Sequence, residues 1–182
     1  LPLKPILSTS KPLSIVGVLN PYIAKMAEHI GFQALYVSGA AVSNYNLGLQ
    51  DLAVSNSSDV VAQVWRISQT SNCPILVDAD TGWGNYLAIS RTVRELGKAG
   101  AAGCHIEDQI MPKRCGHLDG KEIVATQIMA QRVRAASDAK IDKNFCLIAR
   151  SDARAIEGLD KAIDRMKAYV DAGADMIFPE AM

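Results

Sequence analysis

The sequence predicts an α/β fold of parallel strands and crossover helices, and we favour a (β/α)8 barrel of the TIM type over an open doubly wound sheet. Three observations carry this prediction. Short apolar runs alternate with longer amphipathic runs, glycine recurs where helices would end, and polar residues follow the ends of several strands. Strands that alternate with helices in this way form parallel sheets joined by crossover helices.

The strand candidates are short and almost continuously apolar, which is typical of a parallel sheet buried on both faces. They are Ile15–Leu19, Ala34–Ser38, Ile75–Ala79, Gly103–Ile106, Cys146–Ala149 and Met176–Phe178. A closed barrel needs eight strands and typically about 250 residues. We therefore expect one domain over residues 1–182 that forms an incomplete barrel of about six β/α units and lacks two at its C-terminal end.

The helix candidates lie between these strands and are amphipathic. They are Tyr22–Ile30, Asp59–Thr70, Leu87–Ala99, Thr126–Ala139 and Leu159–Ala172. In the last one, apolar residues recur every three to four positions and lay a single stripe along the helix. Gly31, Gly100 and Gly173 stand just past helix ends, where glycine can adopt the left-handed conformation that caps a helix.

The polar residues at the strand ends favour a barrel over an open sheet. No glycine-rich dinucleotide fingerprint follows the first strand. The polar residues instead follow five different strands: Ser38, Asp78, Asp80, Glu107, Asp108, Arg150, Asp152 and Glu180. Barrel enzymes build their active sites in this way, from one rim and many strands.

Composition excludes several classes of partner. Lys plus Arg and Asp plus Glu number 19 each, so the sequence gives no basic footprint for nucleic acid or an anionic membrane. No apolar run is long enough to span a bilayer. The four cysteines, Cys73, Cys104, Cys115 and Cys146, lack zinc-site spacing. We expect reduced thiols in a cytoplasmic protein.

The run D-A-D from Asp78 to Asp80 predicts a metal site. Residues two apart on a strand share a face, so both carboxylates point the same way and repel unless a cation lies between them. An all-oxygen pair suits Mg²⁺, and Glu107 would complete the site. The alternative is surface charge at loop starts, but three acids on neighbouring strand ends favour the metal. His105 shares the face of Glu107, and we expect a hydrogen-bonded core residue there.

The run K-R-C-G-H, residues 113–117, follows Pro112 and precedes Gly120, which predicts a loop. Positive charge beside Cys115 favours the thiolate and makes the sulfur a readier proton donor or nucleophile. A basic surface loop with an incidental cysteine explains the run equally well.

Arg150 emerges from an apolar strand and needs a partner. It could pair with Asp152, or it could clamp a substrate carboxylate with two hydrogen bonds. A divalent metal, a cationic clamp and an activated thiol together suit a small polycarboxylate substrate and a reaction through an enolate-like anion.

The loop motif K-R-C-G-H resembles the catalytic loop of the 2-methylisocitrate lyases and, more distantly, of the isocitrate lyases. Further runs of that superfamily agree in order and spacing: Y-V-S-G-A from Tyr36, L-G-L-Q-D ending at Asp51, D-A-D-T-G-W-G from Asp78, H-I-E-D-Q from His105, I-A-R-S-D-A around Arg150 and F-P-E-A from Phe178. The resemblance covers nearly the whole chain. The D-A-D and H-I-E-D-Q runs are common to the isocitrate lyase and phosphoenolpyruvate mutase superfamily, so the short cysteine loop discriminates best.

The resemblance implies a magnesium-dependent lyase, with Mn²⁺ as an alternative ion, that cleaves the tricarboxylate 2-methylisocitrate to pyruvate and succinate in the methylcitrate cycle of propionate catabolism. It also implies a homotetramer, located in the cytoplasm or, in a eukaryote, in the mitochondrial matrix. The implied metal residues are Asp80, with Asp51, Asp78 and Glu107 around it, mostly through water. The implied substrate-binding residues are Ser38, Gly39, Ala40, Gly116, Arg150 and Glu180. The implied catalytic residues are Cys115 as general acid, Arg150, Tyr36, Lys113 and His117.

Some positions depart from the family pattern. Ala40 stands where a second glycine is common, and Leu118 stands where a basic residue is frequent. The family's last two strands carry an asparagine and a threonine that contact substrate, and we expect this chain to lack them. Whether Tyr36 or a nearby carboxylate takes the substrate proton stays open.

Other readings compete with the lyase. Isocitrate lyase, oxaloacetate hydrolase and phosphonomutase belong to the same superfamily. True isocitrate lyases usually carry a longer chain, and the cysteine loop argues against the phosphonomutases. A truncated, non-catalytic subunit is the alternative outside the enzyme class, and its open barrel would expose apolar strand edges.

Overall fold

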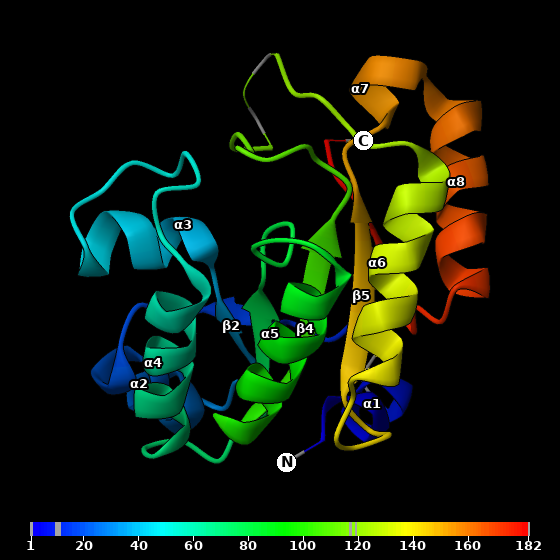
Figure 1. The fold of residues 1–182 in the computed structure, drawn as a ribbon. Helices are drawn as coiled ribbons and strands as arrows, with labels where there is room; N and C mark the ends of the chain where they lie inside the picture. The colour runs from blue at the N-terminus through cyan, green and yellow to red at the C-terminus, as the bar shows by residue number, and fades with distance from the viewer. Residues whose placement is uncertain (1, 10–11, 117, 119, 182) are drawn as a thin grey trace.

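A computed structural model describes residues 2–9, 12–116, 118 and 120–181. Six parallel strands form one sheet in sequence order, as predicted (Figure 1). The strands are β1 Val16–Gly17, β2 Leu35–Val37, β3 Ile75–Asp78, β4 Ala101–Glu107, β5 Cys146–Ser151 and β6 Met176–Pro179. Within the described ranges β1 and β6 are the two edges and do not pair with each other. The sheet is therefore an incomplete barrel, and the predicted fold class is confirmed.

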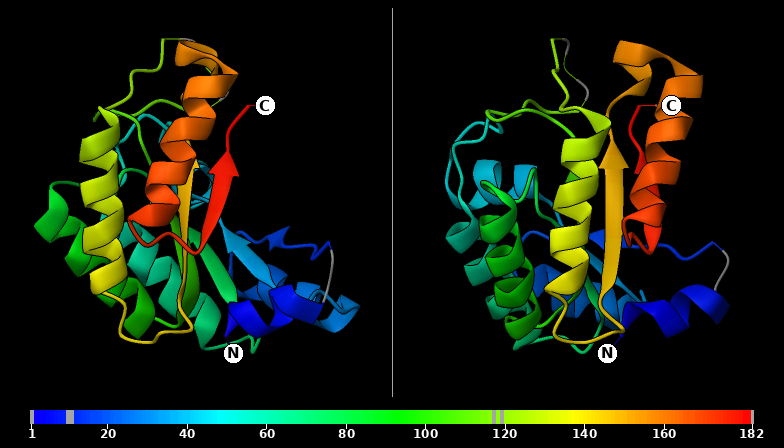
Figure 2. Two further views of the ribbon diagram at one scale, coloured as in Figure 1. Left: turned by 90° about the vertical axis from the view of Figure 1, so that its right-hand side faces the viewer. Right: turned by 45° about the vertical axis from the view of Figure 1, so that its right-hand side comes forward.

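Five long helices connect the strands and pack on the outside of the sheet (Figures 1 and 2). They are α2 Pro21–Ile30, α4 Ser57–Ser68, α5 Tyr86–Lys98, α6 Thr126–Asp138 and α8 Leu159–Asp171. Asparagines at positions 20, 56 and 85 accept hydrogen bonds from the first backbone N–H groups of α2, α4 and α5. All five predicted helices are present within a few residues of their predicted bounds.

Four shorter elements escape sequence prediction because each spans only one or two turns. They are α1 Leu3–Thr9, α3 Gly39–Ala41, the π-helix η1 Val42–Asn46 and α7 Arg154–Glu157. In Figure 2, α1 lies at the end of the sheet opposite to the loops that follow β4 and β5. None of the described helices combines the length and apolar character needed to cross a membrane.

The sheet divides the apolar side chains into two clusters. The larger one fills the space between sheet and helices and includes Leu35 and Val37. The smaller one lies inside the curl of the sheet, where Leu3 of α1 packs against Leu76 and Ile148. Since side chains alternate along a strand, the inward Leu76 of β3 and Ile148 of β5 are each followed two positions later by an inward polar residue, Asp78 and Arg150.

Candidate active site

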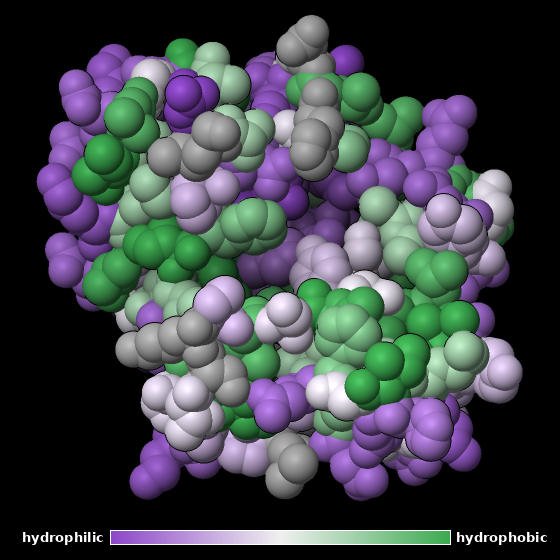
Figure 3. All heavy atoms as spheres, turned by 180° about the vertical axis from the view of Figure 1, so that it is seen from behind, coloured by the Kyte–Doolittle hydropathy of each residue, from purple (hydrophilic) through white to green (hydrophobic). Residues whose placement is uncertain are grey.

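The inward side chains at the C-terminal ends of β3, β4 and β5 are polar and buried. Asp78 is in register with His105, and Glu107 is in register with Arg150. All four side chains are no more than 10% exposed. On the face opposite to that of Figure 1 the surface is hollowed, and the floor of the hollow is hydrophilic (Figure 3). The predicted gathering of polar groups at one rim is therefore present.

Asp78 and Asp80 form the centre of this polar group. Asp78 accepts hydrogen bonds from the backbone N–H of Gly39 and of Asp80, both at 3.2 Å. Asp80 has a left-handed backbone, with φ of 46°, which aspartate tolerates better than most residues. Burial, followed by the nearby Asp78 carboxylate, raises the pKa of Asp80 to about 7. The pKa of Asp78 stays below its ordinary value because, although burial opposes ionisation, His105 and Lys113 favour its charged form.

Glu107 is the least satisfied acid of the group. Its Oε1 is buried and has no hydrogen-bond partner among the described residues. Its Oε2 lies 3.4 Å from Nε of Arg150. Burial raises the pKa of Glu107 well above its ordinary value, and the carboxylates of Asp78 and Asp80 add to this rise. Leaving a buried carboxylate oxygen unpaired is costly, so this atom indicates a ligand at the site.

Lys113 brings a cation into the acidic group from the loop after β4. Its Nζ lies 2.5 Å from Oδ1 of Asp51 and 2.8 Å from Oδ1 of Asp80. Although burial opposes the charged ammonium, Asp80 and Asp51 outweigh it and raise the pKa of Lys113. The structure thus joins residues 62 positions apart, and it places the predicted Asp51 and Lys113 beside the strand-end acids.

Tyr36 and His105 form a pair on the inner face of β2 and β4. Tyr36 Oη lies 2.8 Å from Nε2 of His105, and the two rings are stacked. Nδ1 of His105 lies 3.7 Å from Oδ1 of Asp78. Burial lowers the pKa of His105 and raises that of Tyr36. The imidazole is therefore neutral and the phenol keeps its proton. His105 is buried and hydrogen-bonded, as predicted, and it lies beside Asp78.

Arg150 pairs with Asp152, which is one of the two roles that its position in the sequence allowed; the clamp for a substrate carboxylate stays a prediction. Its Nε and Nη2 contact Asp152 at 3.1 and 3.3 Å, in the bidentate geometry that arginine and carboxylate favour. Its Nη2 also lies 3.5 Å from Oε2 of Glu180, and the guanidinium stands 5.4 Å from the ring centre of Phe178. Asp152 thus holds the guanidinium in place at the rim, beside Glu107 and Glu180.

The thiol loop, which we define as residues 112–116, lies over this arginine. Gln109 holds it through two hydrogen bonds with the backbone of Arg114, at 2.9 and 3.0 Å. A Cβ at Gly116 would collide with Nη2 of Arg150 and with the carboxylate of Glu180. Glycine is therefore required for the loop to approach the guanidinium so closely. Cys115, which is half-buried and free, precedes it, and His117 lies outside the described residues.

The predicted substrate-binding residues after β2 line the same rim. Ser38 accepts a hydrogen bond from the N–H of Ala41 and so begins α3, and the N–H of Gly39 is bonded to Asp78. Ala40 is half-buried. The structure brings this turn next to the acids, and the role of its residues toward a substrate stays a prediction.

Sequence reasoning left several residues of this region without a role. They are His105, Asp108, Gln109 and Lys121. The alternation of β4 had placed His105 on the face of Glu107. No local pattern marked Gln109 and Lys121, whose partners belong to the folded loop.

The donor set fits a hydrated divalent cation. The described residues include no group of three or more His, Cys, Asp or Glu side chains arranged to hold a metal directly. Mg²⁺ binds through one or two carboxylates and retains several waters, so it does not need such a group. The unpaired Oε1 of Glu107 and the raised pKa of Asp80 both indicate that a cation would be stabilised here.

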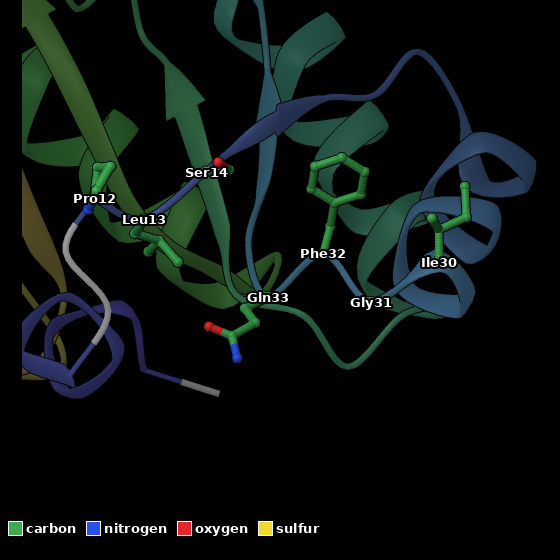
Figure 4. A pocket seen from close by; sticks show the side chains of 7 residues that line it. All are labelled: Pro12, Leu13, Ser14, Ile30, Gly31, Phe32 and Gln33. Atoms are coloured by element: carbon green, nitrogen blue, oxygen red, sulfur yellow. The ribbon is translucent and has the colours of Figure 1, made fainter.

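A second hollow, of about 380 Å³, lies at the other end of the strands. It is lined by Pro12, Leu13, Ser14, Ile30, Gly31, Phe32 and Gln33 (Figure 4). None of these side chains titrates near neutral pH, so this pocket does not compete with the strand-end group as a reactive centre.

Comparison with known proteins agrees with this geometry. The family model described as phosphoenolpyruvate phosphomutase matches residues 3–182. The chain belongs to this family. The 2-methylisocitrate lyase of Shewanella oneidensis is 52% identical over 176 residues, which cover 97% of the chain and 60% of that lyase. The chain thus spans about three fifths of the length of this relative.

Solved structures of the superfamily share the fold. Oxaloacetate acetylhydrolase in complex with the inhibitor 3,3-difluorooxalacetate is 37% identical, with a TM-score of 0.90 over 93% of the chain and 59% of that structure. Phosphonopyruvate hydrolase, solved with oxalate and Mg²⁺, is 28% identical, with a TM-score of 0.80 over 91% of the chain and 57% of that structure. One solved structure that shares the fold was thus crystallised with Mg²⁺.

Proposed function

We propose that the chain carries the active site of a magnesium-dependent 2-methylisocitrate lyase. The observation that carries the proposal is the thiol loop, which seats Gly116 on Arg150 and Glu180 beside the acids Asp80 and Glu107. An acid donor, an arginine clamp and a carboxylate cluster are the groups that a retro-aldol cleavage of a polycarboxylate needs. The 52% identity to a lyase with this activity supports the choice of substrate.

The carboxylates Asp80, Asp78, Asp51 and Glu107 would hold Mg²⁺, or Mn²⁺ in its place. When bound, the ion would acidify the substrate hydroxyl, as metals do for bound water. Lys113 would keep the site from accumulating excess negative charge, since it already pairs with Asp51 and Asp80.

Arg150 and Cys115 would both act on the fragment that becomes succinate, the first by stabilising its negative charge and the second by protonating it. The bond that breaks joins the hydroxyl-bearing carbon to its neighbour, and its electrons move onto the neighbour and into the attached carboxylate. Arg150 would stabilise this anion, since its guanidinium is fixed by Asp152. Cys115 would then give the proton that completes succinate, and the other fragment would leave as pyruvate.

The base that takes the hydroxyl proton would be a carboxylate rather than Tyr36. Burial raises the pKa of Tyr36, so the phenol keeps its proton. Glu107, whose pKa burial also raises, is suited to hold a proton near neutral pH. Tyr36, held by His105, would donate a hydrogen bond to an oxygen of the substrate.

We also propose a cytoplasmic protein that assembles into a homo-oligomer, a tetramer by analogy with the family. Size-exclusion chromatography with light scattering would check this, and a strictly monomeric mass would contradict it.

The direct experiment measures pyruvate release from 2-methylisocitrate with the 182-residue chain, with and without Mg²⁺. Magnesium-dependent pyruvate and succinate would support the proposal. The same assay with isocitrate and oxaloacetate tests the nearest alternatives, and preference for oxaloacetate would favour the hydrolase. A folded chain that binds Mg²⁺ and releases no pyruvate would contradict the proposal and favour a non-catalytic subunit.

A further inference from the structure

Lys121 places a buried ammonium directly behind the thiol loop. Its side chain is 6% exposed, although lysine is rarely buried without a partner. Nζ donates to the backbone carbonyl of Gly116 at 2.5 Å and contacts Oδ1 of Asp152 at 3.0 Å. The residue therefore joins the end of the thiol loop to a carboxylate at the end of β5.

Both partners of Lys121 belong to the site. Asp152 is fully buried and holds Nε and Nη2 of Arg150, and its own N–H is fixed by Asp108 at 2.9 Å. Gly116 rests on the same guanidinium. The ammonium thus links the thiol loop, Arg150 and Asp152 into one network of polar contacts.

This network fixes the backbone on the C-terminal side of Cys115, at Gly116. On the other side Gln109 holds the backbone of Arg114, so the thiol stands between two anchors. A proton donor must lie within hydrogen-bond reach of the atom that it protonates, and small displacements of a catalytic group are costly. The distance between loop and arginine therefore matters for any proton that Cys115 delivers to an anion held by Arg150.

We propose that Lys121 is a positioning residue that latches Cys115 against the Arg150 clamp. The consequence for turnover rests on the proposed function, whereas the latch itself does not. If Lys121 only stabilised the whole domain, replacing it would loosen the entire fold. If it positions Cys115, replacing it would loosen the thiol loop and leave the rest of the fold unchanged.

The first test measures the rate at which iodoacetamide alkylates each cysteine, by peptide mass spectrometry and without substrate. Lys121→Met keeps the length of the side chain but removes its charge, Lys121→Arg keeps the charge, and Lys143→Met is a control on an exposed lysine. We expect Cys115 to react at least about tenfold faster in Lys121→Met, since hydrogen bonds to charged groups contribute that much. The alkylation rate of Cys115 in Lys121→Arg should lie closer to that of the wild type, and the buried Cys104 and Cys146 should stay protected from alkylation in every variant.

Equal rates at Cys115 in the wild type and in Lys121→Met would overturn the latch. Faster alkylation of Cys104 and Cys146 as well would overturn it too, because it would mean that Lys121 supports the whole fold.

The second test measures kcat and KM for pyruvate release. We expect Lys121→Met to lower kcat at least about tenfold with little change in KM, because a misplaced donor slows protonation rather than binding. Lys121→Arg should restore part of kcat. If the wild type releases no pyruvate, the proposed function fails, and alkylation still decides the latch. An unchanged kcat in Lys121→Met beside an active wild type would overturn the positioning role.

Discussion

Glu107 and Asp108 are neighbouring buried acids at the end of β4, and their surroundings are opposite. Asp108 accepts hydrogen bonds from Ser151 at 2.7 Å, from Tyr169 at 2.9 Å and from the N–H of Asp152 at 2.9 Å. Glu107 keeps one oxygen without a described partner and faces Arg150 at 3.4 Å through the other. The carboxylate of Asp108 is therefore fully hydrogen-bonded within the fold, whereas that of Glu107 is not.

The difference follows from the direction of each side chain. Alternation turns Glu107 into the curl of the sheet and Asp108 toward the helices, where Tyr169 of α8 meets it. Buried polar groups are normally satisfied, so an unsatisfied one marks a place where the protein leaves room for a ligand. We therefore propose a functional role for Glu107, whereas the contacts of Asp108 belong to the fold.

The largest effect is expected at the thiol. Cys115→Ser should lower kcat for pyruvate release by roughly 100- to 10,000-fold, the usual contribution of a general acid. Mg²⁺ affinity and the thermal midpoint should change little, because Cys115 is a half-buried residue of a loop. Steady-state kinetics and calorimetry measure both, and near-normal turnover in the variant would remove Cys115 from the acid role.

The next largest effect is a loss of stability at Asp108. Asp108→Ala should lower the free energy of unfolding by roughly 3 kcal/mol or more, because it leaves the buried Ser151 and Tyr169 hydroxyls and the Asp152 N–H unpaired. Urea unfolding followed by circular dichroism measures the change. Asp142→Ala on an exposed loop is the control, and equal stability of the two variants would mean that the outer acid is not structural.

A pH effect is expected at Asp80. Its pKa of about 7 lies above the ordinary value of 3.8, so the folded state holds a proton that the unfolded chain releases. The stability of the metal-free protein should therefore fall as pH rises from about 4 to about 7, by up to roughly 4 kcal/mol. Asp80→Asn should flatten this profile. Unfolding free energies measured across that range decide it, and identical slopes in both proteins would contradict the raised pKa.

The smallest change in stability is expected at Glu107. Glu107→Gln replaces a buried carboxyl group whose Oε1 has no described partner, so the free energy of unfolding should stay within about 1 kcal/mol of the wild type or rise. Turnover should nevertheless be lost, since the carboxylate faces the site. Paired unfolding and activity measurements test this, and a destabilisation as large as that of Asp108→Ala would erase the distinction between the two acids.

Much of the fold could be predicted from the sequence because its signals are local. Apolar runs and helix-ending glycines placed all six strands and the five long helices. Alternation placed His105 and Glu107 on one face of a single strand, where the structure has them. The short α1, whose Leu3 closes the start of the barrel interior, gave too little periodicity to be found.

The contacts that organise the site could not be predicted in this way. The Lys113–Asp51 pair joins positions 62 apart, and the Lys121–Asp152 pair joins positions 31 apart. Each depends on how a loop folds back over the sheet, which no spacing encodes. His105 was expected in the core because an inward histidine usually is, and only the neighbouring Tyr36 and Asp78 reveal its place in the site.

Calorimetric titration of Mg²⁺ into the wild type, Asp80→Ala and the remote control Asp142→Ala tests most directly the central claim that the inner acids form a cation site. We predict saturable binding to the wild type and the control, and a loss of at least about tenfold in affinity for Asp80→Ala, since Mg²⁺ relies on one or two carboxylates. Equal affinity in all three proteins would contradict the claim and remove the inner acids from metal binding.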